Sequence, residues 1–331
     1  MANPNAGIML TLLAEANEAA RYLKYQNAFL RRIYWDNQPI VGVPYQTLTV
    51  VIPQVNEGAV VDIGTGPIQP VDYSYSTVNV TLSMNLSVTN VFKDFDQART
   101  PRRLRDFFQS NFEALLRAIN RRVVGYLTPA NFGNYSLFTG DGTASNQITR
   151  GDITTAWTNL AAVGVPLDDT RNVSLMLTTP SYGYMLQDQT FMYQYITGEQ
   201  QAQDIQQRAM LRTQYGAEIY YDQMMPNFNA GHQGAALLHR YAIAGVTARS
   251  PAGGPNVEEG VVYLNGDDEE TQEVGGMDGS NSLTEGQPTG IPVRIQASYS
   301  QNDQGWVVSM NALVGVAVAR PEMCTLFQSA S

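Results

Sequence analysis

Residues 78–89 carry the strongest structural pattern in the sequence and read Val-Asn-Val-Thr-Leu-Ser-Met-Asn-Leu-Ser-Val-Thr. Apolar side chains alternate strictly with small polar ones, and this period of two is typical of a β-strand with one dry and one wet face. At about 3.3 Å per residue, such a strand spans roughly 40 Å, whereas the usual strand has about 5–6 residues. The pattern therefore predicts one extended strand, part of which projects from the body of the protein.

The preceding segment supplies a partner for this strand. Residues 46–53 form a second β-type run, and glycine and proline recur in residues 54–76 between the two runs. Together they predict a long two-stranded β-arm whose tip is 54–76. Because a lone two-stranded arm is marginally stable in water, we expect its apolar face to lie on another surface.

Two long helices are predicted on either side of the arm. Residues 7–34 are rich in helix formers, and their broad apolar surface favours cover by the same chain or by a neighbour. Residues 100–127 form the better helix, because Thr100 can cap it and Pro101 suits its first position. A single apolar stripe runs along this second helix and comprises Leu104, Phe108, Phe112, Leu115, Ile119, Val123 and Tyr126.

The outer surface of the 100–127 helix is basic. Asp106 and Glu113 interrupt its positive charges, and no aromatic residues interleave on that face. Such a mixed surface favours a solvated face or an ion-pair surface between subunits over a nucleic-acid site. The basic side chains are those of Arg102, Arg103, Arg105, Arg117, Arg121 and Arg122.

The rest of the chain predicts an α/β segment followed by two closing strands. Helices are expected at 151–162, 180–188 and 200–213, and strands at 173–178 and 217–221. Residues 251–290 are interpreted as a loop, since glycine is frequent and nine carboxylates occur without a basic residue. Strands at 291–300 and 306–320 follow, joined by a hairpin turn.

The composition resembles that of a protein interface. Only two of the 20 basic residues are lysines, Lys24 and Lys93, while the chain has 18 tyrosines and 12 methionines. Interfaces are poor in lysine and rich in tyrosine, methionine and arginine, although a genome-wide bias toward arginine would give the same profile. The net charge of −10 argues against general electrostatic binding of nucleic acid. No apolar run is long enough to cross a membrane, and the N-terminus does not read as a secretory signal.

No catalytic, cofactor-binding or metal-binding constellation is present in the sequence. The phosphate-binding Gly-Lys-Ser/Thr motif, the Gly-x-Ser-x-Gly elbow and His-Glu-x-x-His are all missing. The acidic run 267–270 lacks the alternating spacing of a calcium loop. His232, His239 and Cys324 are interpreted as structural residues. We therefore predict a protein that is not an enzyme and carries no cofactor.

The order of these elements resembles the major capsid protein of tailed bacteriophages, a shell fold known from the phage Hong Kong ninety-seven and also called the Johnson fold. The resemblance is nearest to the coat-protein branch of short-tailed phages. It rests on five stretches: the long strand 78–95, the strand-then-helix step Leu175–Leu186, the strand within Leu211–Asp222, the His-Arg-x-Ala-Ile-Ala stretch at Leu238–Ala244, and the closing strand 315–318 with Pro321-Glu322. Residues 213–218 depart from the pattern because they lack a second glycine.

The resemblance implies an α+β fold with an N-terminal arm, an extended β-hairpin loop, a peripheral domain with a long spine helix, and an axial domain. The corresponding divisions are 1–44 for the helical arm and 45–92 for the extended loop with its long strand. The peripheral domain is 93–150 with the spine helix at 101–127. The axial domain is 151–290 with the acidic loop 251–290, and strands in 291–331 return to the peripheral domain.

The function that the resemblance implies is assembly of pentamers and hexamers into an icosahedral shell around double-stranded DNA, without specific DNA binding. The implied partners are further copies of the chain, a scaffolding protein that the N-terminal arm contacts, a portal, and a decoration or cement protein. The implied location is the virion capsid, assembled in the bacterial cytoplasm. Covalent cross-linking is not expected with two lysines. The expected assembly contacts are Val78, Val80, Leu82, Gly64, Pro67, Arg102, Arg103, Arg117 and Arg121.

Two alternative functions remain open at this point. An encapsulin-like compartment would use the same fold to enclose an enzyme, with no portal or scaffold. A calcium-dependent, β-rich surface or carbohydrate-binding protein would use the acidic loop as its ion site. A hydrolase with paired carboxylates is a more remote alternative, since such pairs cannot be recognised before the fold is known.

Overall fold

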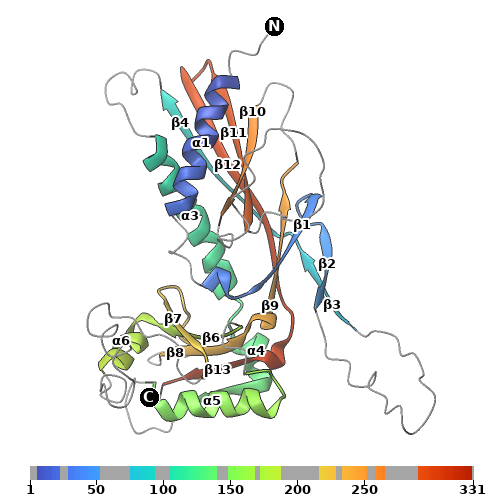
Figure 1. Cartoon of the computed structure of the whole chain (residues 1–331), viewed down its shortest axis with the longest axis vertical. Helices are drawn as coiled ribbons and strands as arrows, with labels where there is room; N and C mark the ends of the chain where they lie inside the picture. The colour runs from blue at the N-terminus through green and yellow to red at the C-terminus, as the bar shows by residue number, and fades with distance from the viewer. Residues whose placement is uncertain are drawn as a thin grey trace, which may run out of the picture.

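The computed structural model describes residues 6–22, 29–52, 75–93, 104–139, 148–167, 172–187, 216–228, 233–251, 258–264 and 290–329. Two bodies, each built around one sheet, are stacked along the long axis, and a two-stranded arm lies at their side (Figure 1). The upper body contains a six-stranded sheet with helices α1 and α3. The lower body contains a five-stranded sheet with helices α4, α5 and α6.

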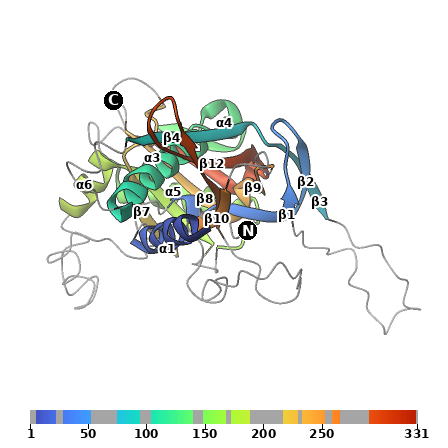
Figure 2. The ribbon, with the colours of Figure 1, turned by 90° about the horizontal axis from the view of Figure 1, so that it is seen from above.

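The upper body contains most of the long strands. Its sheet has the order β1-β9-β12-β11-β10, and β4 also pairs with β12. Helices α1 and α3 pack side by side on this sheet (Figures 1 and 2). The elements are α1 (Ala6–Tyr22), α3 (Leu104–Val124), β1 (Tyr34–Val41), β4 (Met84–Lys93), β9 (Ile243–Arg249), β10 (Glu258–Leu264), β11 (Ile291–Ser300) and β12 (Gly305–Val318).

Helix α3 confirms the predicted long helix and its apolar stripe. Phe108, Phe112, Ile119 and Val123 are fully buried. Small residues of α1, including Ala16, are equally buried in the same core, so the two helices approach closely. The predicted start of the helix at Thr100 and Pro101 lies outside the described residues.

The lower body is a mixed sheet of order β5-β13-β8-β6-β7. A capping box starts α5, because Thr149 Oγ1 accepts from the Asp152 N–H while the Asp152 carboxylate accepts from the Thr149 N–H. The elements are α4 (Pro129–Ser136), α5 (Arg150–Ala162), α6 (Thr179–Gln187), β5 (Leu137–Thr139), β6 (Val173–Thr178), β7 (Glu218–Asp222), β8 (Gly234–His239) and β13 (Cys324–Gln328). The helices predicted at 151–162 and 180–188 are thus confirmed, and the one at 200–213 lies outside the described residues.

The arm consists of β2 (Thr47–Ile52) and β3 (Ser76–Thr81), which pair antiparallel. The prediction of one continuous strand over 78–89 was wrong. The strand stops after Thr81, and β4 then begins at Met84 with β12 as its new partner. Between them, the backbone of Leu82 exchanges hydrogen bonds of 2.9 Å with Tyr45 and Gln46. The alternation of side chains continues across this break, which is why the sequence conceals the change of partner.

The N-terminal prediction of a helix over 7–34 was also wrong from Phe29 onward. Residues Phe29–Arg31 form the single 3₁₀ turn η1, and β1 follows as a parallel partner of β9. The register of β1 shifts between Asn37 and Val41, the segment that contains Pro39. Proline has no N–H to donate and is confined to such irregular or edge positions. Within the range predicted as a helical arm, α1 and β1 are therefore both part of the upper body.

Two strands were missed near the C-terminus. Strand β10 falls inside the predicted acidic loop 251–290 and pairs throughout with β11. Strand β13 lies between β8 and β5 in the lower sheet, and all of its residues are buried. The predicted domain ranges therefore need correction, since β9 and β10 belong to the upper sheet and β13 to the lower one. Strand pairing depends on distant partners and crosses any boundary drawn along the chain.

Candidate assembly surface

The inner face of the arm is covered by the chain itself. Leu48, Val50 and Ile52 of β2 and Val80 of β3 pack with Leu82 in a separate apolar cluster, here called the arm-base cluster. The opposing side of this cluster consists of Ala244, Val246 and Ala248 of β9 and Leu313 of β12. Each of these side chains is at most 7% exposed. The other surface that the arm needs is therefore found within the same subunit.

Glycine permits this close approach of arm and body. A Cβ atom placed on Gly315 of β12 would lie 2.5 Å from the carbonyl oxygen of Thr81 in β3. Only a residue without a side chain can occupy such a position unless the backbone moves.

We expect Gly315→Ala to loosen the arm and to lower the free energy of unfolding by about 1–3 kcal/mol, the usual cost of overpacking. Urea unfolding of the full chain measures this difference. Gly183→Ala is the matched control, because a Cβ at Gly183 in α6 meets nothing within 4 Å. Equal losses of stability in both variants would contradict the close approach of β3 to β12.

The outer face of the arm consists of uncharged side chains that point away from the arm-base cluster. Thr47 bonds Thr81 and Thr49 donates to Asn79, each across the two strands at 3.1 Å. These cross-strand bonds satisfy polar groups that would otherwise demand water. Beyond them, Val51 and Tyr75 are 48% and 55% exposed and belong to the same outward-facing row of the β2–β3 pair.

A second group of exposed apolar residues lies at the other end of the arm, before β2 begins. Val41, Val43 and Tyr45 are 55%, 59% and 77% exposed. Tyr45 has a φ of 68°, a conformation that is costly for a large side chain. These residues, together with Val51 and Tyr75, are here called the outer arm surface.

Charge is missing from this region. Residues 37–56 and 73–92 contain no Asp, Glu, Lys, Arg or His, although 15% of the whole chain is charged. Burying uncharged side chains avoids the large desolvation cost of burying charges. The outer arm surface can therefore be covered by a second protein surface at low electrostatic cost.

Comparison with known proteins decides the fold. No protein-family model and no curated protein matches the sequence. A chain of Mycobacterium phage Che8 is similar in structure, with a TM-score of 0.52, 13% identity, and coverage of 86% of this chain and 85% of that one. The capsid of Ralstonia phage GP4 is similar with a TM-score of 0.52 and 9% identity, and the match covers 90% of this chain and 87% of that one. The capsid of the Cyanophage P-SCSP1u is similar with a TM-score of 0.50 and 11% identity, and the match covers 92% of this chain and 88% of that one.

The chain has the Johnson-type capsid fold. The predicted α+β fold class is confirmed, since the chain combines helices with three sheets and shares its fold with these capsid chains. The assignments of α3 as the spine helix and of the β2–β3 arm as the extended loop stay predictions. The assignment of an axial domain likewise stays a prediction. The expected relation to the short-tailed-phage branch stays a prediction.

The expected assembly contacts have different places in this Johnson-type fold. Val80 and Leu82 are fully buried inside the subunit, which corrects their assignment as contacts to a neighbour. Val78 is half-buried beside the same arm-base cluster. Arg117 and Arg121 are exposed on α3, and Arg117 pairs with Glu113 one turn earlier. The remaining four lie outside the described residues: Gly64, Pro67, Arg102 and Arg103.

The described residues present no obvious chemistry. They hold no group of three or more His, Cys, Asp or Glu side chains that could bind a metal. His239 is buried, and its Nδ1 accepts from the Tyr241 N–H at 3.3 Å. Cys324 is buried at the start of β13, and this burial raises the pKa of its thiol. Among the described helices, none is long and apolar enough to span a membrane.

Sequence reasoning missed the five residues of the outer arm surface. Val41 and Val43 lie between the predicted helix 7–34 and the predicted strand 46–53, where no element was expected. Val51 and Tyr75 are apolar residues at outward-facing positions, where the alternation leads one to expect polar residues. One signal could have found them, namely the two uncharged runs 37–56 and 73–92.

Proposed function

We propose that this protein is the building block of a tailed-bacteriophage capsid, in which pentamers and hexamers form an icosahedral shell around double-stranded DNA. The observation that carries the proposal is the outer arm surface, an uncharged and partly apolar surface that a neighbouring copy would cover. The Johnson-type capsid fold supports the proposal independently.

The energetics favour assembly through many modest contacts. At about 25 cal/mol per Å², roughly 1,000 Å² of apolar contact per subunit corresponds to about 25 kcal/mol before the costs of association. Those costs remove much of this gain, so single contacts stay weak. Closed symmetry then repeats the same contact around the shell and makes the assembly stable.

The proposed shell function also implies which partners the protein binds and where it is located. The shell would form in the bacterial cytoplasm with a scaffolding protein and a portal, and a decoration protein would bind the finished virion capsid. A chain with a net charge of −10 repels DNA, so the genome would be enclosed without being bound. The protein would act as a structural subunit and not as an enzyme.

Sedimentation and negative-stain electron microscopy of the purified full chain test this function. Closed, uniform particles tens of nanometres across are the expected result, either from the chain alone or after co-expression with its neighbouring genes. Particles that enclose a protein cargo in place of double-stranded DNA would favour the compartment alternative. A chain that remains monomeric under both conditions would contradict a shell function.

A further inference from the structure

Among the strands that the structure describes, five form the edges of the two larger sheets. Strands β1 and β10 end the path of the six-stranded sheet, and β4 pairs with β12 alone. Strands β5 and β7 end the five-stranded sheet. An edge strand presents a row of backbone donors and acceptors to other chains. Proteins usually protect such an edge by short length, charge, proline or irregular geometry.

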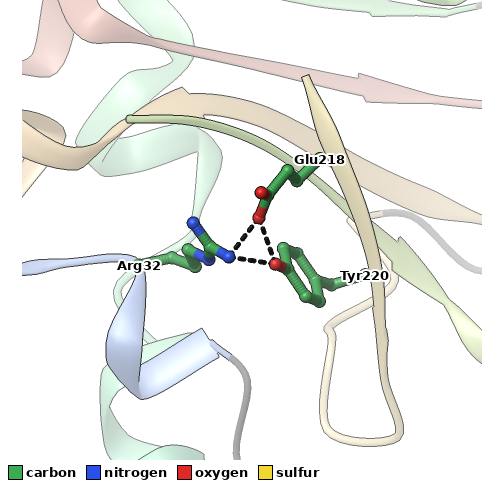
Figure 3. Close-up of polar contacts among 3 residues, drawn as sticks. All are labelled: Arg32, Glu218 and Tyr220. Carbon is green, nitrogen blue, oxygen red and sulfur yellow. Dashed lines mark hydrogen bonds and ion pairs between the residues drawn. The ribbon is translucent and has the colours of Figure 1, made fainter. Parts of the chain in front are cut away.

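Strand β7 shows how one of these edges is protected. It has five residues, and the first and last of them are Glu218 and Asp222. The Arg32 guanidinium, just before β1, binds both the Glu218 carboxylate and the Tyr220 hydroxyl, and that hydroxyl donates to Glu218 (Figure 3). At the other end, Asp222 accepts a hydrogen bond of 2.6 Å from the Asn120 amide of α3. Charges at both ends of so short a strand discourage pairing with another chain.

Three more edge strands carry a protecting feature of their own. Strand β5 has only three residues. Strand β10 begins with two acidic residues, Glu258 and Glu259. Strand β1 contains Asp36 and Pro39, and its register along β9 is interrupted. Four of the five edges are therefore poor templates for a further strand.

Strand β4 has none of these features. It is ten residues long, contains no proline, and pairs with β12 without a shift of register. Its first nine residues are uncharged, and Lys93 is the last. Figure 1 shows β4 at the margin of the upper sheet, on the side away from β10 and β11. The side chains of Asn85, Ser87, Thr89 and Val91 are exposed there. A long, regular and uncharged edge of this kind favours pairing with another strand.

The charge pattern of β4 indicates that its partner is β4 of a second copy. A two-fold axis perpendicular to the sheet makes the two strands antiparallel and brings the donors of each to the acceptors of the other. Lys93 carries the charge of the strand, so the two ammonium groups would lie at opposite ends of the pair, roughly 30 Å apart. A parallel pair would place them side by side.

We propose that β4 of one subunit pairs antiparallel with β4 of a second copy around a two-fold axis near Thr89. The four strands β10-β11-β12-β4 of each copy then join into one continuous sheet. This contact deepens the proposed shell function and rests on it for the identity of the partner. A shell of pentamers and hexamers needs contacts between these rings as well as within them, and a two-fold contact joins two rings. One pair of strands buries little area, so the isolated pair is weak.

Disulfide trapping in the full chain tests the pairing, because a covalent bond captures a weak contact. Single cysteines replace three exposed residues of β4 in turn, as Ser87→Cys, Thr89→Cys and Val91→Cys, and oxidised glutathione is added. The cysteine nearest the axis should give about tenfold more covalent dimer than Thr158→Cys, which is exposed on α5, since paired strands hold facing Cα atoms within disulfide range. Cys324 is buried, so the wild-type chain should give no dimer.

Added charge on β4 should prevent the pairing. In the Thr89→Cys chain, Ser87→Lys with Val91→Lys should lower the yield of dimer about tenfold, because like charges then face one another across the pair. Thr154→Lys with Thr155→Lys is the matched control, since it adds the same charge to exposed positions of α5 and should leave the yield unchanged. Circular dichroism confirms that each variant is folded.

Electron microscopy of the same samples separates this pairing from the shell function. Covalent dimers from a chain that forms no shells would support the pairing and contradict the shell function. Closed shells in which none of the three cysteines forms a dimer would overturn the pairing and leave the shell function standing. A chain that gives neither shells nor dimers would overturn both.

Discussion

The double variant Val51→Lys with Tyr75→Lys should fold normally and form no closed shells. Both side chains are about half exposed on the outer arm surface, so lysine is accommodated there in the free subunit. Covering two ammonium groups with a neighbouring subunit would require their desolvation without a partner, which costs several kcal/mol for each charge. That cost recurs at every copy of the interface and exceeds what weak symmetric contacts supply.

Circular dichroism and electron microscopy of the same preparation measure folding and assembly together. The matched control is Val51→Thr with Tyr75→Phe, which keeps the size and the neutrality of both side chains and should assemble. Shells of normal yield from the lysine variant would show that the outer arm surface is not an interface. Loss of folding in that variant would show instead that the surface is buried in the subunit.

Leu82→Asp should destabilise the isolated subunit by at least about 4 kcal/mol, before any question of assembly arises. Leu82 is fully buried in the arm-base cluster. The substitution removes a large apolar side chain from a packed core and places a carboxylate where water is excluded. Urea unfolding of the unassembled chain measures the effect.

Ser83→Asp is the control for this prediction. Ser83 is the next residue along the chain and is exposed, so its substitution should change the free energy of unfolding by no more than about 0.5 kcal/mol. If the apolar row of residues 78–82 faced a neighbouring subunit, Leu82→Asp would leave the free subunit stable and would abolish only assembly. The two substitutions therefore distinguish a row buried within one chain from a row buried between chains.

The sequence alone determined the features that depend on local periodicity. Helix α3 follows from the apolar stripe that includes Phe108 and Phe112, since side chains three and four apart share one face of a helix. The arm strands follow from strict alternation. The order of these elements, read as a whole, was sufficient to indicate the capsid fold.

The residues of the assembly surface could be predicted only in part. The two uncharged runs that flank the arm tip are visible in the sequence, yet alternation cannot tell which side of the arm stays exposed. The alternation pointed to Val80 and Leu82, which are buried within the subunit. An apolar strand face gives the same sequence pattern whether it packs against its own chain or against a neighbouring subunit. The exposed Val51 and Tyr75 stand outside the alternating pattern.

Only the tertiary structure determined which strands pair with one another. Thr81 pairs with Thr47 from 34 residues earlier, whereas Met84 pairs with Val314 in the last long strand. A period of two continues unchanged through this switch, because alternation reflects backbone geometry and not the identity of the neighbouring strand. The joining of Arg32 to Glu218 and Tyr220 has the same origin. These groups come from segments far apart in the chain, and only the packing of the two bodies brings them together.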